Sequence, residues 1–281
     1  MSPRPARSPR RVRRPATAGP TAATRAVGRA NGPAAPSGNP SGLRRLLSGL
    51  LGVGLLLGGC GAAANGAAGG SGCVAGTAGT HSNVNAPEEP AKAVATPTAA
   101  CWAKIAPTPL YQTVIGKAPA GVTVTFKTAW SPQDVYIRAS VQHWPLRCHN
   151  PQNWWDCDAI EYYLGPNDKG GSYGSNDVQW GVLSTGVLSQ GTNAKGMTGD
   201  GFQGLATVRK GKGYVAELIA PFGPIGVTPK KGALVGFTMA GDIPLQGGSV
   251  HQSKATVAQM MWAGTDHNYN NDAQWGTITL A

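Results

Sequence analysis

The chain has 281 residues, is rich in glycine and proline, and carries a formal charge of +11 that is distributed unevenly. Residues 1–60 contain ten of the 24 Lys and Arg residues and no Asp or Glu, so the remaining chain is close to neutral, with 14 basic and 13 acidic residues. The basic excess therefore lies in a segment with the features of an export leader, and it gives no support to nucleic acid as a partner.

Residues 43–60 have the organisation of a lipoprotein signal peptide. After Arg44 and Arg45 the sequence reads LLSGLLGVGLLLGGC, an apolar run too short to span a bilayer comfortably. Its end, residues 57–60, resembles a bacterial lipobox, in which Cys60 would receive the lipid. An ordinary signal peptide or an amphipathic anchor is the alternative. We expect a basic, disordered leader at 1–42 and an exported protein, lipid-anchored at the cell membrane or outer envelope with its domain facing outside the cytoplasm.

Residues 61–100 consist mainly of Gly, Ala, Thr, Pro and Asn, with few large apolar side chains. Such a segment buries too little surface to fold, so it is expected to be a flexible tether. Aromatic and β-branched residues appear from Cys101 onwards. Residues 101–281 are long enough for one hydrophobic core, and we expect a single domain there.

Four cysteines remain when Cys60 is assigned to lipid: Cys73, Cys101, Cys148 and Cys157. An even number in an exported chain predicts two disulfides, and four cysteines allow three pairings. We favour Cys148–Cys157, which encloses a short Asn- and Trp-rich loop, with Cys73–Cys101 joining the tether to the domain.

The domain reads as strands almost throughout. Alternating or β-rich segments occur at residues 122–128, 135–142, 159–164, 176–183, 205–209, 214–219, 233–240, 256–262 and 275–280. The residues Lys210-Gly211-Lys212-Gly213 predict a hairpin, and no long window keeps helical spacing with good caps. The expected fold is all-β, an antiparallel β-sandwich of jelly-roll or immunoglobulin-like type after a disordered N-terminal region.

Residues 141–166, reading VQHWPLRCHNPQNWWDCDAIEYYLGP, carry the strongest functional signal. Alternation puts Glu161 and Tyr163 on one face of a strand, and Ile160 and Tyr162 on the other. A loop rich in Trp, Asn and Gln thus runs into a strand that carries a carboxylate. Aromatic ring faces with nearby hydrogen-bonding groups are typical of sugar-binding surfaces, because a sugar ring offers an apolar C–H face and a rim of hydroxyls.

Five segments resemble motifs of the family 9 carbohydrate-binding modules and their relatives in the DOMON-like superfamily, in the same order along the chain. They are residues 131–137 (SPQDVYI), 154–161 (WWDCDAIE), 213–222 (GYVAELIAPF), 231–237 (KGALVGF, followed by Asp242) and 275–280 (WGTITL). The resemblance covers residues 122–281. It implies non-catalytic binding of an oligosaccharide or polysaccharide in a slot where two tryptophans clamp a sugar beside a carboxylate and amides.

The resemblance places Trp155 as the first ring, Glu161 as the carboxylate and Trp262 as the second ring. Trp154 is a weaker candidate, and Trp275 is expected to fill the core. Arg138 and Gln142, on the preceding strand, are possible further donors. The alternative is that the tryptophans only cover the end of the sandwich and that Glu161 is a solvated or ion-paired carboxylate.

No cofactor is expected, although relatives of this family bind structural calcium. Asp156, Asp158, Asp266 and Asp272 offer the oxygen ligands that calcium prefers, but without the spacing of an EF-hand. Exposed acids in polar loops are usually just solvated, so both interpretations stay open.

We do not expect an enzyme. Glu161 and Glu217 could be proposed as a glycosidase pair, but Glu217 matches a structural strand of the family, and no H-E-x-x-H motif is present. One alternative function is a haem-binding electron-transfer module of the same superfamily, with ligands drawn from histidine, lysine and the methionines Met197, Met239, Met260 and Met261. Another is an adhesion or assembly domain without a ligand.

Overall fold

The computed structural model describes residues 73–89, 96–150, 153–194, 200–245 and 257–281. The elements in chain order are β1 (Asn83–Ala86), α1 (Ala99–Lys104), β2 (Thr108–Pro109), β3 (Gln112–Ile115), β4 (Thr123–Trp130), β5 (Asp134–Gln142), the 3-10 turn η1 (Trp154–Asp156), β6 (Ala159–Pro166), β7 (Val178–Leu183), β8 (Leu188–Gln190), β9 (Gln203–Arg209), β10 (Gly213–Pro221), β11 (Leu234–Pro244), β12 (Val257–Met261) and β13 (Gly276–Leu280). None of the helices in these ranges is long and apolar enough to cross a membrane. The predicted leader, signal peptide, Cys60 and Met197 lie outside the described residues.

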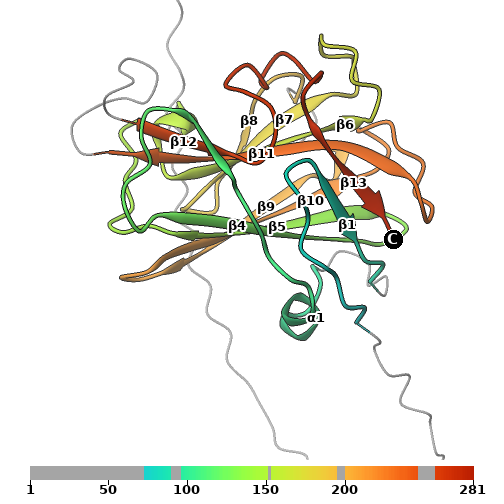
Figure 1. Ribbon diagram of the computed structural model, residues 1–281, viewed down its shortest axis with the longest axis horizontal. Coiled ribbons are helices and arrows are strands. Elements are labelled where there is room, and N and C mark those ends of the chain that lie inside the picture. Colours follow the sequence, from blue (N-terminus) through green and yellow to red (C-terminus); the bar gives the residue numbers. More distant parts are fainter. Residues whose placement is uncertain (1–72, 90–95, 151–152, 195–199, 246–256) are drawn as a thin grey trace, which may run out of the picture. The chain divides into compact units, whose positions relative to one another are not determined.

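The strands form two sheets, which appear as two layers in Figure 1. The eight-stranded sheet has the order β1-β13-β11-β6-β7-β8, and β12 and β3 extend it beside the second half of β11. The five-stranded sheet has the order β2-β4-β5-β10-β9. Neighbouring strands are antiparallel except β1 and β13, which are parallel. The predicted antiparallel β-sandwich is confirmed.

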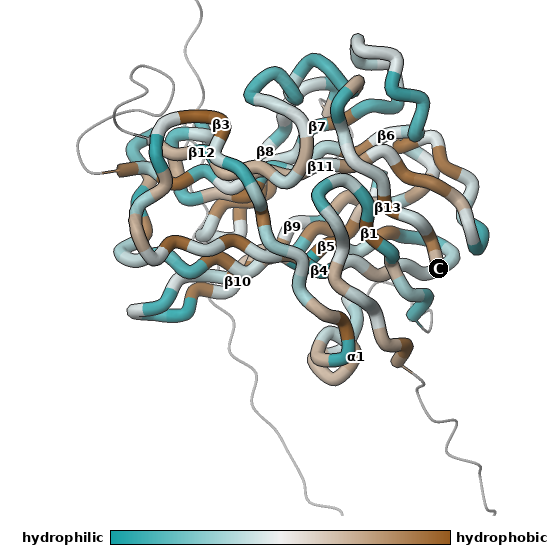
Figure 2. Tube along the Cα trace, in the orientation of Figure 1, coloured by the Kyte–Doolittle hydropathy of each residue, from teal (hydrophilic) through white to brown (hydrophobic). Residues whose placement is uncertain are grey.

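The core lies between the sheets, and the side-chain alternation of the strands builds it. On β6, Ile160, Tyr162 and Leu164 belong to the main cluster of buried apolar side chains, whereas Tyr163 packs in a separate cluster on the opposite face. Figure 2 shows the hydrophobic positions concentrated along the strands and the hydrophilic ones in the connecting loops. This period of two leaves the outer face of the eight-stranded sheet free to carry polar groups.

Both favoured disulfides are formed, Cys73–Cys101 and Cys148–Cys157. The second one closes the connection between β5 and β6, residues 143–158. Its two cysteines also pair as an isolated antiparallel bridge. The disulfide therefore fixes the second part of the connection covalently, just before β6 begins.

Residues 73–89 differ from the predicted tether, which was expected to continue to residue 100. Strand β1 pairs with β13, and the Glu89 backbone N–H donates to the Trp130 carbonyl at 2.8 Å. The sequence signal was weak because β1, reading NVNA, is only four residues long and is stabilised by pairing rather than by its own composition. The folded unit therefore begins well before Cys101.

The short helix α1 was also not expected from the sequence. Its N-cap Thr98 accepts a hydrogen bond from the Cys101 backbone N–H at 3.3 Å, and its Trp102 is buried against the five-stranded sheet. Six residues are too few to show helical periodicity, so this helix depends on its cap and on packing.

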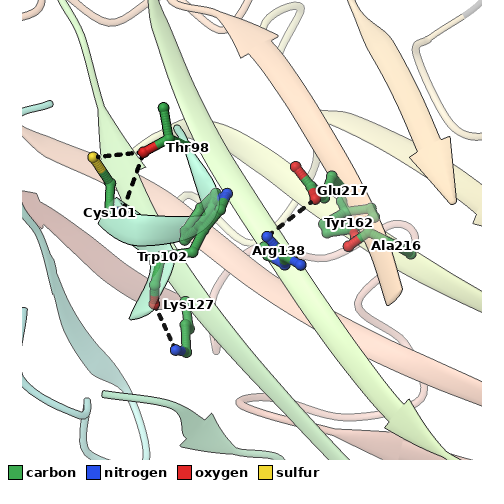
Figure 3. Close-up of polar contacts among 8 residues, drawn as sticks. All are labelled: Thr98, Cys101, Trp102, Lys127, Arg138, Tyr162, Ala216 and Glu217. Atoms are coloured by element: carbon green, nitrogen blue, oxygen red, sulfur yellow. Dashed lines mark hydrogen bonds and ion pairs between the residues drawn. The ribbon is translucent and has the colours of Figure 1, made fainter. Parts of the chain in front are cut away.

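Figure 3 shows the outer face of the five-stranded sheet beside α1. Lys127 on β4 donates to the Trp102 carbonyl at 2.6 Å. Arg138 on β5 lies 3.5 Å from Glu217 on β10 and 5.8 Å from the centroid of the Trp102 ring. These contacts all lie on the five-stranded sheet.

Candidate functional site

A cleft of about 710 Å³ lies on the outer face of the eight-stranded sheet. Its residues come from β3, η1, β6, β7, the end of β8, β12 and the loop that follows β12. They are Ile115, Trp154, Trp155, Glu161, Tyr163, Gln179, Gln190, Gly191, Thr192, Gln259, Asp266, His267 and Tyr269. Aromatic rings and hydrogen-bonding side chains thus share one hollow surface.

Strand register explains why Glu161 stands in the floor of this cleft. Its position on β6 faces Gly181 on β7 and Ala240 on β11, so both cross-strand neighbours are small. The same alternation that sends Ile160 and Tyr162 into the core turns Glu161 outward. Glu161 is nevertheless only 3% exposed, because aromatic and amide side chains surround it.

Three side chains hold the Glu161 carboxylate by hydrogen bonds. Tyr163 donates its hydroxyl to Oε2, and Gln179 donates to the same oxygen at 3.0 Å. Gln259 donates to Oε1 at 3.3 Å and to Asp242 Oδ1 at 3.0 Å. The carboxylate is therefore fixed in orientation by groups from three strands, which is a preorganised acceptor.

Gln179 is itself oriented by the loop after β8. Its amide oxygen accepts hydrogen bonds from the Thr192 backbone N–H at 3.2 Å and the Thr192 hydroxyl at 3.1 Å. This fixes the amide with its NH2 group toward Glu161, so the donor assignment follows from the network.

One negative charge rather than two is favoured in this network. Burial raises the pKa of Asp242 well above its usual range, and the charge of Glu161 and a hydrogen bond to it act in the same direction. Burial and the neighbouring Glu161 also raise the pKa of the Tyr163 hydroxyl. The neutral Tyr163 hydroxyl thus donates its hydrogen bond to Glu161 without adding charge to the network.

Trp154 and Trp155 form the side of the cleft at η1. Trp154 is buried and its ring lies directly over Gly181, where an added Cβ would come within 2.4 Å of the indole. Trp155 is half-buried and meets Trp154 edge to face, with ring centroids 5.5 Å apart. Glycine at position 181 therefore allows the Trp154 indole to pack directly on the sheet, and Trp155 packs against Trp154.

The loop between β12 and β13 contributes the other aromatic groups. His267 and Tyr269 line the cleft, and their ring centroids are 6.3 Å apart. Tyr269 is 45% exposed, so much of its ring faces solvent. Aromatic groups consequently reach the cleft from two segments more than a hundred residues apart in the sequence.

The structure brings Trp154, Trp155 and Glu161 together as the sequence indicated, but not Trp262. Trp262 is 1% exposed and packs in the core against Phe126 and Phe237, with centroid distances of 5.2 and 5.4 Å. The alternation of β12 turns this position inward, so the expected slot between Trp155 and Trp262 does not form.

Arg138 and Gln142 also lie away from the cleft, because β5 belongs to the five-stranded sheet. Arg138 pairs with Glu217, as Figure 3 shows, so Glu161 and Glu217 stand on different sheets. Gln142 lies at the end of β5 and lines a different groove. The sheet assignment of β5 was the information that the sequence lacked.

Sequence reasoning missed Tyr163, Gln179, Gln259 and Tyr269. Alternation from Glu161 points to Tyr163, two residues further on the same face. Tyr269 stands in the polar loop GTDHNYNND (residues 264–272), which follows Trp262, the residue expected to be the second ring. Gln179 and Gln259 carry no local signal, because only strand pairing brings them to Glu161.

The four acids named as calcium candidates are dispersed. Asp158 is fully buried and accepts from His143 at 2.8 Å and from the Arg147 backbone N–H at 2.5 Å. Asp156 is buried beside Asn153, and Asp266 lines the cleft. Asp272 alone belongs to a group of acids.

Asp168, Asp177 and Asp272 have carboxylate oxygens within 4.8 Å of one another. The backbone N–H groups of Gly170 and Gly171 donate to Asp272, and Asp177 Oδ1 is buried without a hydrogen-bond partner among the described residues. Three carboxylates with an unsatisfied buried oxygen fit the oxygen ligands of calcium. If calcium binds, this cluster would hold it and the ion would neutralise their charge.

The methionines offer little to the haem alternative. Met239 is fully buried in the main core, and Met261 packs against Tyr163 and Trp275. Neither lines the cleft. Both fill apolar space, as methionine does in many cores.

Comparisons with known proteins agree with this arrangement. A comparison with curated protein sequences finds no match. Among solved structures, a carbohydrate binding module family 9 from Caldicellulosiruptor kristjanssonii in complex with glucose is 19% identical, with a TM-score of 0.57 over 71% of this chain and 95% of that chain. The same organism's module in complex with cellotriose is 19% identical, with a TM-score of 0.54 over 70% and 93%. The family described as "Carbohydrate family 9 binding domain-like" matches residues 95–281. The chain belongs to this family.

Proposed function

We propose that this protein binds carbohydrate without turning it over, and that a lipid on Cys60 holds it at the cell envelope. The observation that carries the proposal is the cleft around Glu161, where a buried and fully hydrogen-bonded carboxylate stands among aromatic side chains. Such a site combines an apolar surface with a few fixed polar groups, as small-molecule sites usually do.

Each part of the cleft has a role toward a sugar ring. The exposed face of Trp155 or Tyr269 covers the apolar C–H face of a pyranose, and stacking there removes water from both surfaces. Glu161 accepts a hydroxyl hydrogen bond in a direction already set by Gln179 and Gln259. Because the acceptor is fixed before the ligand arrives, little further ordering is required on binding.

The solved relatives support neutral glucose-based ligands. The family 9 modules with which this chain shares its fold were solved in complex with glucose and with cellotriose. We infer that the cleft takes a short neutral glycan of this class.

The geometry argues against glycoside hydrolysis in the cleft. A glycosidase places two carboxyl groups roughly 5–10 Å apart across the scissile bond. Asp242 and Glu161 instead accept hydrogen bonds from the same Gln259 amide, at 3.0 and 3.3 Å, so the two carboxyl groups lie side by side. Glu217, the other candidate, stands on the opposite sheet with Arg138. This arrangement supports the proposal of binding without turnover.

The lipid anchor rests on the sequence at residues 43–60. A basic pair, a short apolar run and L-G-G-C precede a Gly- and Ala-rich segment that ends before β1. This order would place a flexible tether of limited length between the membrane and the sandwich. A Cys60→Ser variant is expected to lose the lipid, measured as a mass difference and as release of the chain from membranes.

Isothermal titration of the full chain with glucose, cellotriose and xylotriose tests the proposed function. The Trp155→Ala and Tyr269→Ala variants should bind about 10- to 100-fold more weakly, since covering a large aromatic side chain with the ligand contributes about 1.5–3 kcal/mol. Trp144→Ala is the matched control, because Trp144 is an exposed indole outside this cleft.

Two outcomes would contradict the proposal. One is that no neutral glycan binds to the folded chain. The other is that Trp144→Ala weakens binding as much as Trp155→Ala, which would place the neutral glycan elsewhere.

A further inference from the structure

A second groove, of about 760 Å³, lies at the end of the five-stranded sheet. It is bordered by the end of β5, the beginning of the β5–β6 connection, the end of β9, the β9–β10 hairpin, residues 119–122 before β4 and Leu245 after β11. It shares no lining residue with the cleft around Glu161. None of the family motifs recognised in the sequence explains it.

The charged side chains that line this groove are basic. They are Arg147, Arg209 and Lys212, and no Asp or Glu is among the described residues of the lining. The domain as a whole is close to neutral, so this is a local excess of positive charge. Arginine and lysine gathered without a carboxylate form a site for an anion.

An indole stands in the same groove. Trp144 is 44% exposed, so much of its ring is accessible to a ligand in the groove. Gln142 and Ser140 from β5 line the groove beside it and add polar groups. An exposed aromatic face with cations and amides matches a sugar ring that carries a negative charge.

The backbone beneath these side chains is fixed. Asp158 accepts hydrogen bonds from the His143 ring and the Arg147 backbone N–H, on either side of Trp144, and the Cys148–Cys157 disulfide closes the loop behind them. The His143 N–H donates to the Lys212 carbonyl at 3.1 Å, which ties the loop to the hairpin. At Gly213, with φ of +141°, an added Cβ would meet the Val141 carbonyl at 2.0 Å, so the hairpin sits directly against β5. The groove is therefore built by rigid elements.

We propose that this groove binds an acidic saccharide. A sugar ring lies on Trp144, and its carboxylate or phosphate is held by Arg147, Arg209 and Lys212. The arginine forks bind a planar or tetrahedral oxyanion through paired N–H groups, and lysine adds a point charge. This inference does not rest on the proposed function of the first cleft, since the two sites use different residues.

Titration calorimetry of the full chain with trigalacturonate, glucose 6-phosphate and uncharged cellotriose tests the proposal. Arg209→Gln/Lys212→Gln should weaken binding of the acidic probe by about 10- to 100-fold, since it removes two of the three cations that hold the oxyanion. Trp144→Ala should weaken it by about tenfold. The two anionic probes distinguish a uronate from a phosphate as the bound group.

The double variant Lys230→Gln/Lys231→Gln is the matched control, because it removes two exposed lysines that line neither site. It should change binding of the acidic probe by less than about twofold. An equal loss of binding in this control would mean that the acidic probe is held only by general attraction to positive charge, and it would overturn the proposal. So would the absence of binding by either acidic probe, or binding of anionic lipid vesicles with no binding of the soluble acidic probes. If Trp144→Ala does not fold, the Arg209/Lys212 double variant decides alone.

Discussion

The cleft around Glu161 and the groove around Trp144 are built from the same β5–β6 connection but have opposite electrostatics. The connection gives Trp144 and Arg147 to the basic groove and Trp154 and Trp155 to the cleft. In the cleft the charged group is a buried carboxylate held by strands. In the groove the charges are cations on a loop and a hairpin, and Arg209 and Lys212 are exposed.

This difference predicts two kinds of recognition. A buried, preoriented carboxylate discriminates between hydroxyl arrangements, because only a correctly placed hydroxyl adds a hydrogen bond to those from Tyr163, Gln179 and Gln259. Exposed cations attract any nearby anion, and their attraction falls as salt rises. We therefore expect binding in the cleft to change little with ionic strength and binding in the groove to weaken with it.

The largest expected effect separates the tryptophans of the cleft from those of the core. Trp262→Ala should lower the free energy of unfolding by about 3–5 kcal/mol, since it removes a fully buried indole that packs on Phe126 and Phe237. Trp155→Ala should cost less than about 1.5 kcal/mol, because Trp155 is only half-buried at the rim. Urea denaturation measures both. Equal losses of stability would mean that Trp155 is also a core residue.

A smaller effect is expected at Asp158, which anchors the loop that carries Trp144 and Arg147. Asp158→Ala should lower the free energy of unfolding by about 3 kcal/mol, because it leaves the His143 ring and the Arg147 N–H without their buried acceptor. Binding of the acidic probe should weaken as well, since the loop carrying Trp144 loses its anchor. Asp158→Asn, which keeps one acceptor oxygen, should lie between this variant and the wild type. A fully stable Asp158→Ala protein would show that the disulfide alone holds the loop.

Much of the sandwich was predictable because its strands alternate strongly. The strands around Phe126, Ile137 and Leu218 show a clear period of two, and the Lys210–Gly213 turn predicted the β9–β10 hairpin. Strand β1 and helix α1 escaped prediction because both are short. Strand β1 is stabilised by pairing with β13, which is distant in the sequence, and α1 by its cap Thr98 and by the packing of Trp102 on the five-stranded sheet.

The cleft was predictable only in part, for a similar reason. Trp154, Trp155 and Glu161 lie within one short segment, so a local pattern could identify them. Gln179 and Gln259 reach Glu161 only through the pairing of β6 with β7 and of β11 with β12. Trp262 was wrongly expected in the cleft. Whether its side chain points into the core or to the surface depends on its register relative to β12. Composition near that position does not decide it.

A third prediction concerns the floor of the cleft and leaves the basic groove unchanged. Gly181→Ala would put a Cβ within 2.4 Å of the Trp154 ring, so the indole must move. We expect a loss of about 1–3 kcal/mol in stability from overpacking, together with weaker binding of the neutral glycan. Gly223→Ala is the control, because nothing lies within 4 Å of the added Cβ there. Neutral-glycan binding unchanged by Gly181→Ala would mean that Trp154 does not shape the site.

The smallest expected effect tests the acid cluster, which belongs to neither site. Burial raises the pKa of Asp177 to about 6, while the Gly174 N–H lowers it and the charges of Asp272 and Asp168 raise it. Because the folded state holds this proton more tightly than the unfolded state, Asp177 makes the folded state more stable as the pH falls from about 6 to about 4. In chelator, wild type should therefore gain about 1 kcal/mol relative to Asp177→Asn when the pH falls from about 6 to about 5.

Calcium should reverse that dependence if the cluster binds it. The ion requires ionised carboxylates, so protons would compete with it, and the calcium-dependent stabilisation should fall as the pH drops through about 6. Thermal unfolding of wild type and Asp177→Asn is measured with chelator and with calcium at both pH values. It separates the stabilisation by protonation of Asp177 from the stabilisation by calcium. A wild-type unfolding midpoint that calcium does not raise at neutral pH would contradict calcium binding. The Asp272 and Asp177 carboxylates would then be stabilised by the backbone N–H groups of Gly170, Gly171 and Gly174. The raised pKa of Asp177 would then be the whole electrostatic consequence of bringing them together.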